Sequence, residues 1–295
     1  MTISTAKFQS LTKRDLDNIF HNQLSEFKSY LPDIFTREVP KARLVNSQLI
    51  SDIDTPALWD GQIYYGEAEE TYSKTLAPLK YSLGFKVDND MSRFDLYNQT
   101  KMITKQTARK MKMQKERIGA SILTGAFDTS LVADGLSLCN TAHTSYVGGS
   151  NQGNSGTSAL SSAAIEATRL LGSKMQTDKD DIDPIDYDTI IINSDNEETL
   201  WEILHTSGKL GTANNDLNFN KGKYKIIVWR NFLNEGDWFM CDSRLMKEYF
   251  KFYEWQPITF IESADFDVQA TKMASIMQNN AEAIDWKPIY GHNPA

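Results

Sequence analysis

The sequence contains few of the residues that build metal and redox sites. Among 295 residues there are two cysteines, Cys139 and Cys241, and four histidines. No Cys-x-x-Cys pair occurs, so the sequence predicts neither a zinc cluster nor a disulfide framework. This low cysteine content fits a protein of a reducing cytoplasm. We expect no metal and no other cofactor.

Features of membrane proteins and of nucleotide-binding enzymes are also missing. No apolar run approaches the length needed to span a bilayer, and residues 1–10 lack the apolar core of a signal peptide. The patterns G-x-x-x-x-G-K-[ST], G-x-G-x-x-G and H-E-x-x-H do not occur, and no internal repeat is visible. The sequence therefore predicts no membrane partner and offers no strong signal for an enzyme.

The composition is that of a folded protein with an acidic balance. Hydrophobic residues make up 40% of the chain, which is enough for a real core. The formal net charge is −8, whereas a protein that bound DNA with its whole surface would be basic overall. Any basic function must therefore be local.

Positive charge concentrates in the stretch 91–127, which lacks proline and has no glycine before Gly119. Apolar residues recur there at steps of three and four, which predicts one long helix that ends near Gly125. Residues 101–117 hold seven lysines and arginines and one acid, Glu116. Two interpretations follow: a solvated helix whose lysines keep it soluble, or a cationic ridge that faces a polyanion.

The flanking segments predict an α+β protein. Residues 12–31 form an amphipathic helix, and an extended arm follows it to residue 44. Residues 44–90 are a long excursion that contains the clearest strand, where apolar and polar residues alternate over 80–87. Helices and strands are mixed after residue 160 without a regular βαβ alternation.

Two further patterns are candidate sites. Cys139 and His143 lie four residues apart, and a Cys-His pair can activate a thiolate. However, the pair occupies a loop without an obvious orienting carboxylate, so a packed thiol beside a loop histidine is the preferred interpretation. Six aspartates fall within 178–188, but they lack the glycine and the terminal glutamate of an EF-hand loop. A solvated acidic loop is favoured over a calcium site.

Several local phrases resemble a known family. DGLSLCNTAHTS at 134–145 is similar to a segment of the Mu-like major head subunits, with Ser145 where proline is common. The Gly/Asn-rich stretch 148–157, the Gln-Thr-Asp turn at 176–178 and AEAIDWKPIYG at 281–291 are also similar. On these phrases and on its order of parts, the chain resembles the major capsid proteins of tailed double-stranded-DNA bacteriophages, which have the Johnson fold.

This resemblance implies a division of the chain into arm, loop and two domains. The N-terminal arm would be 1–46 and the extended loop, a β-hairpin, 47–90. The peripheral domain would be 91–150 and 257–295, with a spine helix at 91–127, and the axial domain would be 151–256. The loop would reach onto a neighbouring subunit, which would complete its strand pair. Its candidate contact residues are Tyr64, Tyr65, Glu67, Glu69 and Glu70.

The resemblance also implies a function without catalysis. The chain would assemble into pentamers and hexamers of an icosahedral head shell around double-stranded DNA, in the virion capsid, after assembly in the host cytoplasm. The portal, decoration proteins and a separate scaffolding protein are possible partners; since the arm before the loop is short, scaffolding would come from a separate protein or from none. The candidate DNA-facing residues are Lys101, Lys105, Arg109 and Lys112.

Three alternatives remain open at this point. An encapsulin, which is a compartment that holds enzyme cargo, has the same fold. A cytoplasmic hydrolase would use Cys139 and His143. A polyanion-binding module would use the basic helix and would show steeply salt-dependent binding as an isolated subunit.

Overall fold

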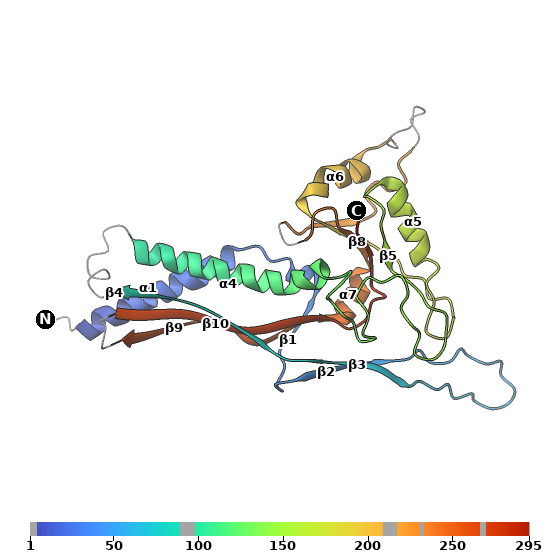
Figure 1. Ribbon diagram of the computed structural model, residues 1–295, viewed down its shortest axis with the longest axis horizontal. Coiled ribbons are helices and arrows are strands. Elements are labelled where there is room, and N and C mark those ends of the chain that lie inside the picture. The colour runs from blue at the N-terminus through green and yellow to red at the C-terminus, as the bar shows by residue number, and fades with distance from the viewer. Residues whose placement is uncertain (1–4, 89–97, 209–216, 231–232, 266–269, 295) are drawn as a thin grey trace.

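The computed structural model describes residues 5–88, 98–208, 217–230, 233–265 and 270–294. It confirms an α+β fold: an elongated unit with a long sheet, a second unit around a smaller sheet, and a thin extended loop (Figure 1). The long sheet has the strand order β1-β9-β10-β4. Its strands are β1 (Thr36–Glu38), β9 (Phe250–Asp265), β10 (Ala270–Ala283) and β4 (Leu79–Asp88).

The long helix α4 (Gln99–Thr124) lies along this sheet and packs against β10 and β4. Its buried residues repeat at helical spacing, as in Thr104, Ala108 and Met111, so one side of the helix is buried along its length. Gly125 caps the C-terminal end, as the sequence predicts. The predicted start near residue 91 lies outside the described residues.

The N-terminal arm lies on its own subunit. Helix α1 (Thr5–Glu26) packs along α4, and the ring of Phe20 stacks on Phe260 of β9 with centroids 4.8 Å apart. A short helix, α2 (Leu31–Ile34), follows. The first helix thus begins earlier and ends earlier than the predicted 12–31. The sequence left open whether the arm covers its own domain or a neighbour, and the contacts favour its own.

Strand β4 corrects one expectation about the extended loop. The family resemblance implied that a neighbouring subunit completes the strand pair of the loop, with its clearest strand at 80–87. Instead β4 pairs with β10 of the same chain, in a continuous antiparallel register from Leu79↔Asn279 to Asp88↔Ala270. Residues 79–88 therefore belong to the long sheet. The hairpin is formed by β2 (Val45–Ile50) and β3 (Glu70–Leu76), which pair antiparallel.

The second unit is built on a five-stranded sheet of order β5-β11-β8-β6-β7. Its strands are short and mostly buried, and three helices, α5, α6 and α7, border the sheet (Figure 1). The strands are β5 (Ser155–Gly156), β6 (Thr189–Ile192), β7 (Lys225–Val228), β8 (Trp238–Cys241) and β11 (Ile289–His292). The helical elements are α5 (Ser162–Gly172), a 3-10 turn η1 (Ser194–Asn196), α6 (Glu197–His205) and α7 (Ser243–Tyr249).

One hydrophobic core runs through both units. Trp229, Trp238 and Tyr187 are its largest fully buried side chains, and Phe35 of the arm joins the same cluster. Strand β9 crosses the domain boundary that the sequence placed between residues 256 and 257, because it enters the long sheet already at Phe250.

Candidate functional site

The segment between β2 and β3, residues 51–69, exposes several large apolar side chains to solvent. Leu58 is 96% exposed and Tyr65 80% exposed, and Trp59 and Ile63 are also largely open to solvent. Soluble proteins rarely leave so many large apolar side chains together in water unless they form an interaction site. The structure places all five predicted contact residues here, on the surface of the loop or at its base. They are Tyr64, Tyr65, Glu67, Glu69 and Glu70.

The loop is nevertheless ordered by a hub at Asp54. The Asp54 carboxylate accepts hydrogen bonds from the Tyr64 hydroxyl at 2.9 Å and from the Glu67 N–H at 3.0 Å. It also pairs with Lys179, whose ammonium group donates to the Glu67 carbonyl at 2.9 Å. The bond from Lys179, with those from Glu67 and Tyr64, lowers the pKa of Asp54 to about 2. The loop is thus held in one shape by charged hydrogen bonds.

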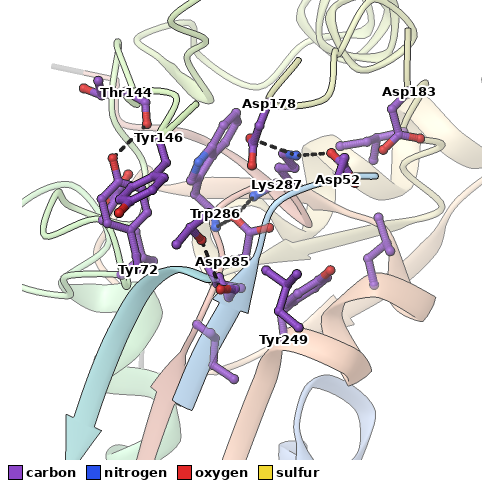
Figure 2. A pocket seen from close by; sticks show the side chains of 18 residues that line it. Asp52, Tyr72, Thr144, Tyr146, Asp178, Asp183, Tyr249, Asp285, Trp286 and Lys287 are labelled. Atoms are coloured by element: carbon purple, nitrogen blue, oxygen red, sulfur yellow. Dashed lines mark hydrogen bonds and ion pairs between the residues drawn. The ribbon is translucent and has the colours of Figure 1, made fainter. Parts of the chain in front are cut away.

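The base of the loop lies against the second unit around a small polar cavity of about 110 Å³. Figure 2 shows Lys287 between two carboxylates, with its Nζ 3.4 Å from Asp178 and 3.7 Å from Asp52. The Tyr72 hydroxyl donates to the Thr144 carbonyl at 3.3 Å. The acidic segment 178–188 therefore helps to seat the loop, a role that its sequence did not reveal.

The basic face of α4 is largely solvent-exposed. Lys101, Lys105 and Arg109 are exposed, whereas Lys112 is half-buried. Burial and the neighbouring charge of Lys115 lower the pKa of Lys112. The helix thus presents three of the four predicted cations freely to solvent, and the fourth at the edge of the arm.

Two buried acids join the arm to the body beside this face. Glu254 of β9 pairs with Lys115 at 2.6 Å and with Arg37 of the arm. Glu116 accepts hydrogen bonds from the Ser29 hydroxyl and from a backbone N–H of the arm. Burial raises the pKa of Glu116. Part of the positive charge of α4 is therefore used within the subunit.

The Cys139 and His143 pair does not form a nucleophile and base. Cys139 is buried, and burial raises the pKa of its thiol. The His143 ring instead bonds to Asp134 through Nδ1 at 2.6 Å and to Asn154 through Nε2 at 3.2 Å, and it stacks on Trp286 at 4.4 Å. Asp134 is the orienting carboxylate that the sequence did not identify. These contacts fix the long loop 128–154 against the C-terminal segment.

The described residues also lack two features that other functions would need. No group of three or more His, Cys, Asp and Glu side chains that could hold a metal ion was found in this part of the chain. None of the helices described is both long enough and apolar enough to cross a membrane.

Comparisons with known proteins agree with this architecture. The family model described as phage capsid protein matches residues 71–290. A comparison with curated proteins gives no match. Among solved structures, the capsid of Ralstonia phage GP4 is similar with a TM-score of 0.60 and 11% identity, covering 91% of this chain and 92% of that one.

Two further structures are similar over almost the whole chain. A virus-like particle from Pyrococcus furiosus has a TM-score of 0.55 and 11% identity, with 95% of this chain and 98% of that chain covered. The procapsid of bacteriophage JBD30 has a TM-score of 0.53 and 10% identity, with 99% and 77% covered. At these identities the likeness establishes the fold, whereas the family match covers most of the sequence. The chain belongs to the phage capsid protein family, has the fold of phage major capsid proteins, and is a structural protein of the capsid shell.

Proposed function

We propose that this chain is a major capsid protein that assembles with itself into a closed icosahedral head shell around double-stranded phage DNA. The observation that carries the proposal is the loop 51–69, which holds Leu58, Trp59 and Tyr65 in solvent on a framework fixed by Asp54. A rigid loop with apolar side chains and no cover from its own subunit is suited to bury them on a neighbour. Small contact energies of this kind add up over a closed lattice.

The strand pairing supports a modified division of the chain. We assign residues 1–44 to the arm, 45–76 to the extended loop, and 79–150 with 250–283 to the peripheral domain around the long sheet. Residues 151–249, with the last strand β11, form the axial domain around the small sheet. The bounds of the loop and of the segment 250–283 follow the sheets in which their strands are hydrogen-bonded, and β1 of the arm adds to the long sheet.

The exposed cations of α4 are the proposed DNA-facing residues. Lys101, Lys105 and Arg109 share one side of the helix, and Lys112 follows them at the same side. Because the chain has a net charge of −8, a basic face confined to one helix would orient the polyanion toward one side of the shell. The further proposed partners are portal, scaffolding and decoration proteins, in the virion and, during assembly, in the host cytoplasm.

Within the family, the Mu-like head subunits are the proposed subgroup. The segment 134–145 that suggested them is an ordered structural loop, in which Asp134 and His143 bond to each other. The segment 134–145 therefore has a structural role in the fold. A cargo-holding compartment of the encapsulin type shares the fold, as the similarity to a virus-like particle allows, but the family match to phage capsid proteins favours the head shell.

The test is sedimentation and negative-stain microscopy of the purified chain at several salt concentrations. We expect closed shells, tubes, or rings of five and six subunits. A species that stays monomeric at every concentration, even when the neighbouring genes are co-expressed, would contradict self-assembly. The Cys139→Ser variant should assemble unchanged, because the thiol is buried and both ring nitrogens of His143 bond to other residues. Loss of an enzymatic activity in that variant would favour the hydrolase.

A further inference from the structure

Strand β4 forms one edge of the long sheet. It pairs with β10 over ten residues, and no strand pairs with its other side within the described residues. A long unpaired edge strand exposes a row of backbone donors and acceptors, and proteins usually cover or shorten such edges. Strand β4 is ten residues long and, within the described residues, no second strand covers its outer side, so this edge can accept another strand.

A groove of about 450 Å³ runs beside this edge, between β4 and α4. Its apolar lining includes Leu83 and Phe85 of the strand and Ile103 and Met113 of the helix, and Arg109 and Lys110 add positive charge. Leu83 is 40% exposed. The groove thus offers apolar contacts and two cations next to free backbone groups.

The extended loop has the complementary pattern. In an extended backbone, side chains two residues apart share one side, so Ile63, Tyr65, Glu67 and Glu69 form a row of two apolar residues followed by two acids. All four side chains are exposed. This row matches the apolar and basic lining of the groove in both chemistry and charge.

The backbone of the loop is also prepared for pairing on one side. The N–H groups and carbonyls of Glu67 and Glu69 bond inward, to residues of the same subunit. Those of Gly66 and Ala68 make no hydrogen bond among the residues that the structure describes. The alternation leaves one edge of the segment free.

A subunit cannot fill its own groove with its own loop. Asp54 and Lys179 hold the loop at the end of the molecule where it extends past β2 and β3, whereas β4 and the first turns of α4 lie toward the opposite end (Figure 1). The occupant must therefore come from a second copy. We propose that residues 63–70 of a neighbouring copy add as a strand to the free edge of β4 and place Ile63 and Tyr65 in the groove.

This inference rests on the proposed self-assembly and adds the receiving surface. In such a pairing Ala68 faces away from the groove, on the side of the sheet where Lys80 and Ser82 lie. Disulfide trapping tests it: Ala68→Cys is combined with Ser82→Cys or, for the adjacent register, with Lys80→Cys. Both native cysteines are buried and do not interfere. The control combines Ala68→Cys with Lys174→Cys, at an exposed position on the second unit.

We expect oxidised shells of one β4 pair to give a ladder of covalently linked chains on a denaturing gel, and the control to give monomers. Intact shells without linked chains in either β4 pair would overturn the docking site and leave self-assembly standing. If the unsubstituted chain forms no shells even when the neighbouring genes are co-expressed, self-assembly itself fails.

A charge exchange gives an independent readout in DNA-free subunits, where contacts of α4 with DNA play no part. Arg109→Glu with Lys110→Glu should raise the concentration needed for assembly about tenfold. Glu67→Lys with Glu69→Lys should do the same, and the four changes together should restore assembly. If the quadruple variant needed as high a concentration for assembly as either double variant, the proposed contact would be wrong.

Discussion

The ammonium group of Lys179 is hydrogen-bonded to the carboxylate of Asp54, 125 residues earlier in the chain. This bond links the acidic segment of the second unit to the extended loop, and it lowers the pKa of Asp54 to about 2. The pair therefore stays charged at any pH at which the protein is handled. The direction of the loop is set by a residue that lies outside it.

Replacing Lys179 by methionine should release the loop without unfolding the subunit. Asp54 would keep its bonds to Tyr64 and Glu67 but lose the connection to the body. We expect limited proteolysis within 51–69 to become several-fold faster, roughly as for other locally opened segments, with little change in melting temperature and a reduced yield of shells. Lys174→Met, at an exposed position on the same unit, is the control. Equal cleavage rates in the two variants would contradict the anchoring role.

The buried carboxylate of Glu254 should matter more to stability than a surface acid. Removing one partner of a buried ion pair typically costs about 3–5 kcal/mol. Because Arg37 is largely exposed, we expect Glu254→Gln to lower the free energy of unfolding by about 2 kcal/mol. Urea denaturation measures this value.

The matched control is Glu166→Gln, which removes a partly exposed pair with Arg169 on α5 and should cost less than about 0.5 kcal/mol. Adding Lys115→Met to Glu254→Gln should recover part of the loss, because the unpaired cation is then removed as well. If Glu254→Gln lowered the free energy of unfolding no more than the control does, the ion pairs of Glu254 would not anchor the arm.

The long helix and the strand 80–87 were predictable because their signals are local. Thr104, Ala108 and Met111 repeat at the period of a helix, and the alternation through Phe85 has the period of a strand. Alternation shows which residues face the core, but it does not name the pairing partner. The partner of β4 is 200 residues away at one end, Leu79 opposite Asn279. The resemblance to phage capsid proteins implied a neighbouring subunit as the partner, whereas the chain itself supplies β10.

The candidate surfaces were predictable only where the signal is local in the sequence. The exposed charges of Lys101 and Lys105 follow from helical phase alone. The anchors Lys179 and Lys287, and the Asp134 partner of His143, depend on contacts across the fold that no spacing in the sequence encodes. Helical periodicity alone was not sufficient for Lys112. The pattern placed it in solvent, but it is half-buried and lies beside Ser29 and Leu31 of the arm.

His292 should make the fold sensitive to acid. Its Nε2 lies 2.8 Å from the Thr168 hydroxyl, which itself donates to the Ala164 carbonyl, so Nε2–H is the donor. The other nitrogen, Nδ1, is buried without a hydrogen-bond partner among the described residues, and the ring stacks on Trp238 at 4.1 Å. Burial lowers the pKa of His292 to about 4. The folded protein therefore holds the imidazole of His292 in its neutral form.

This lowered pKa determines how the free energy of unfolding changes with pH. His292 binds a proton near pH 6.5 in the unfolded chain but only near pH 4 in the folded chain. The stability that neutral His292 contributes to the fold is therefore complete above pH 6.5 and is lost as the pH falls toward 4. We expect a loss on the order of 2 kcal/mol over that interval. Urea denaturation at a series of pH values should show a steeper decline for the unsubstituted chain than for His292→Gln. Parallel curves would contradict the assignment.

Charge reversal on the exposed face of α4 should separate DNA packaging from assembly. Lys101→Glu with Lys105→Glu changes two side chains that are exposed and make no ion pair within the described residues, so the fold and the empty shell should remain. The DNA content of purified particles, measured by the ratio of absorbance at about 260 and 280 nm, should fall several-fold because a polyanion now meets a negative face. Lys221→Glu, on the second unit, is the matched control and should leave the DNA content unchanged. If particles of the double variant contain a normal amount of DNA, these lysines do not face the DNA. If the double variant forms no shells at all, the same face of α4 makes contacts between subunits.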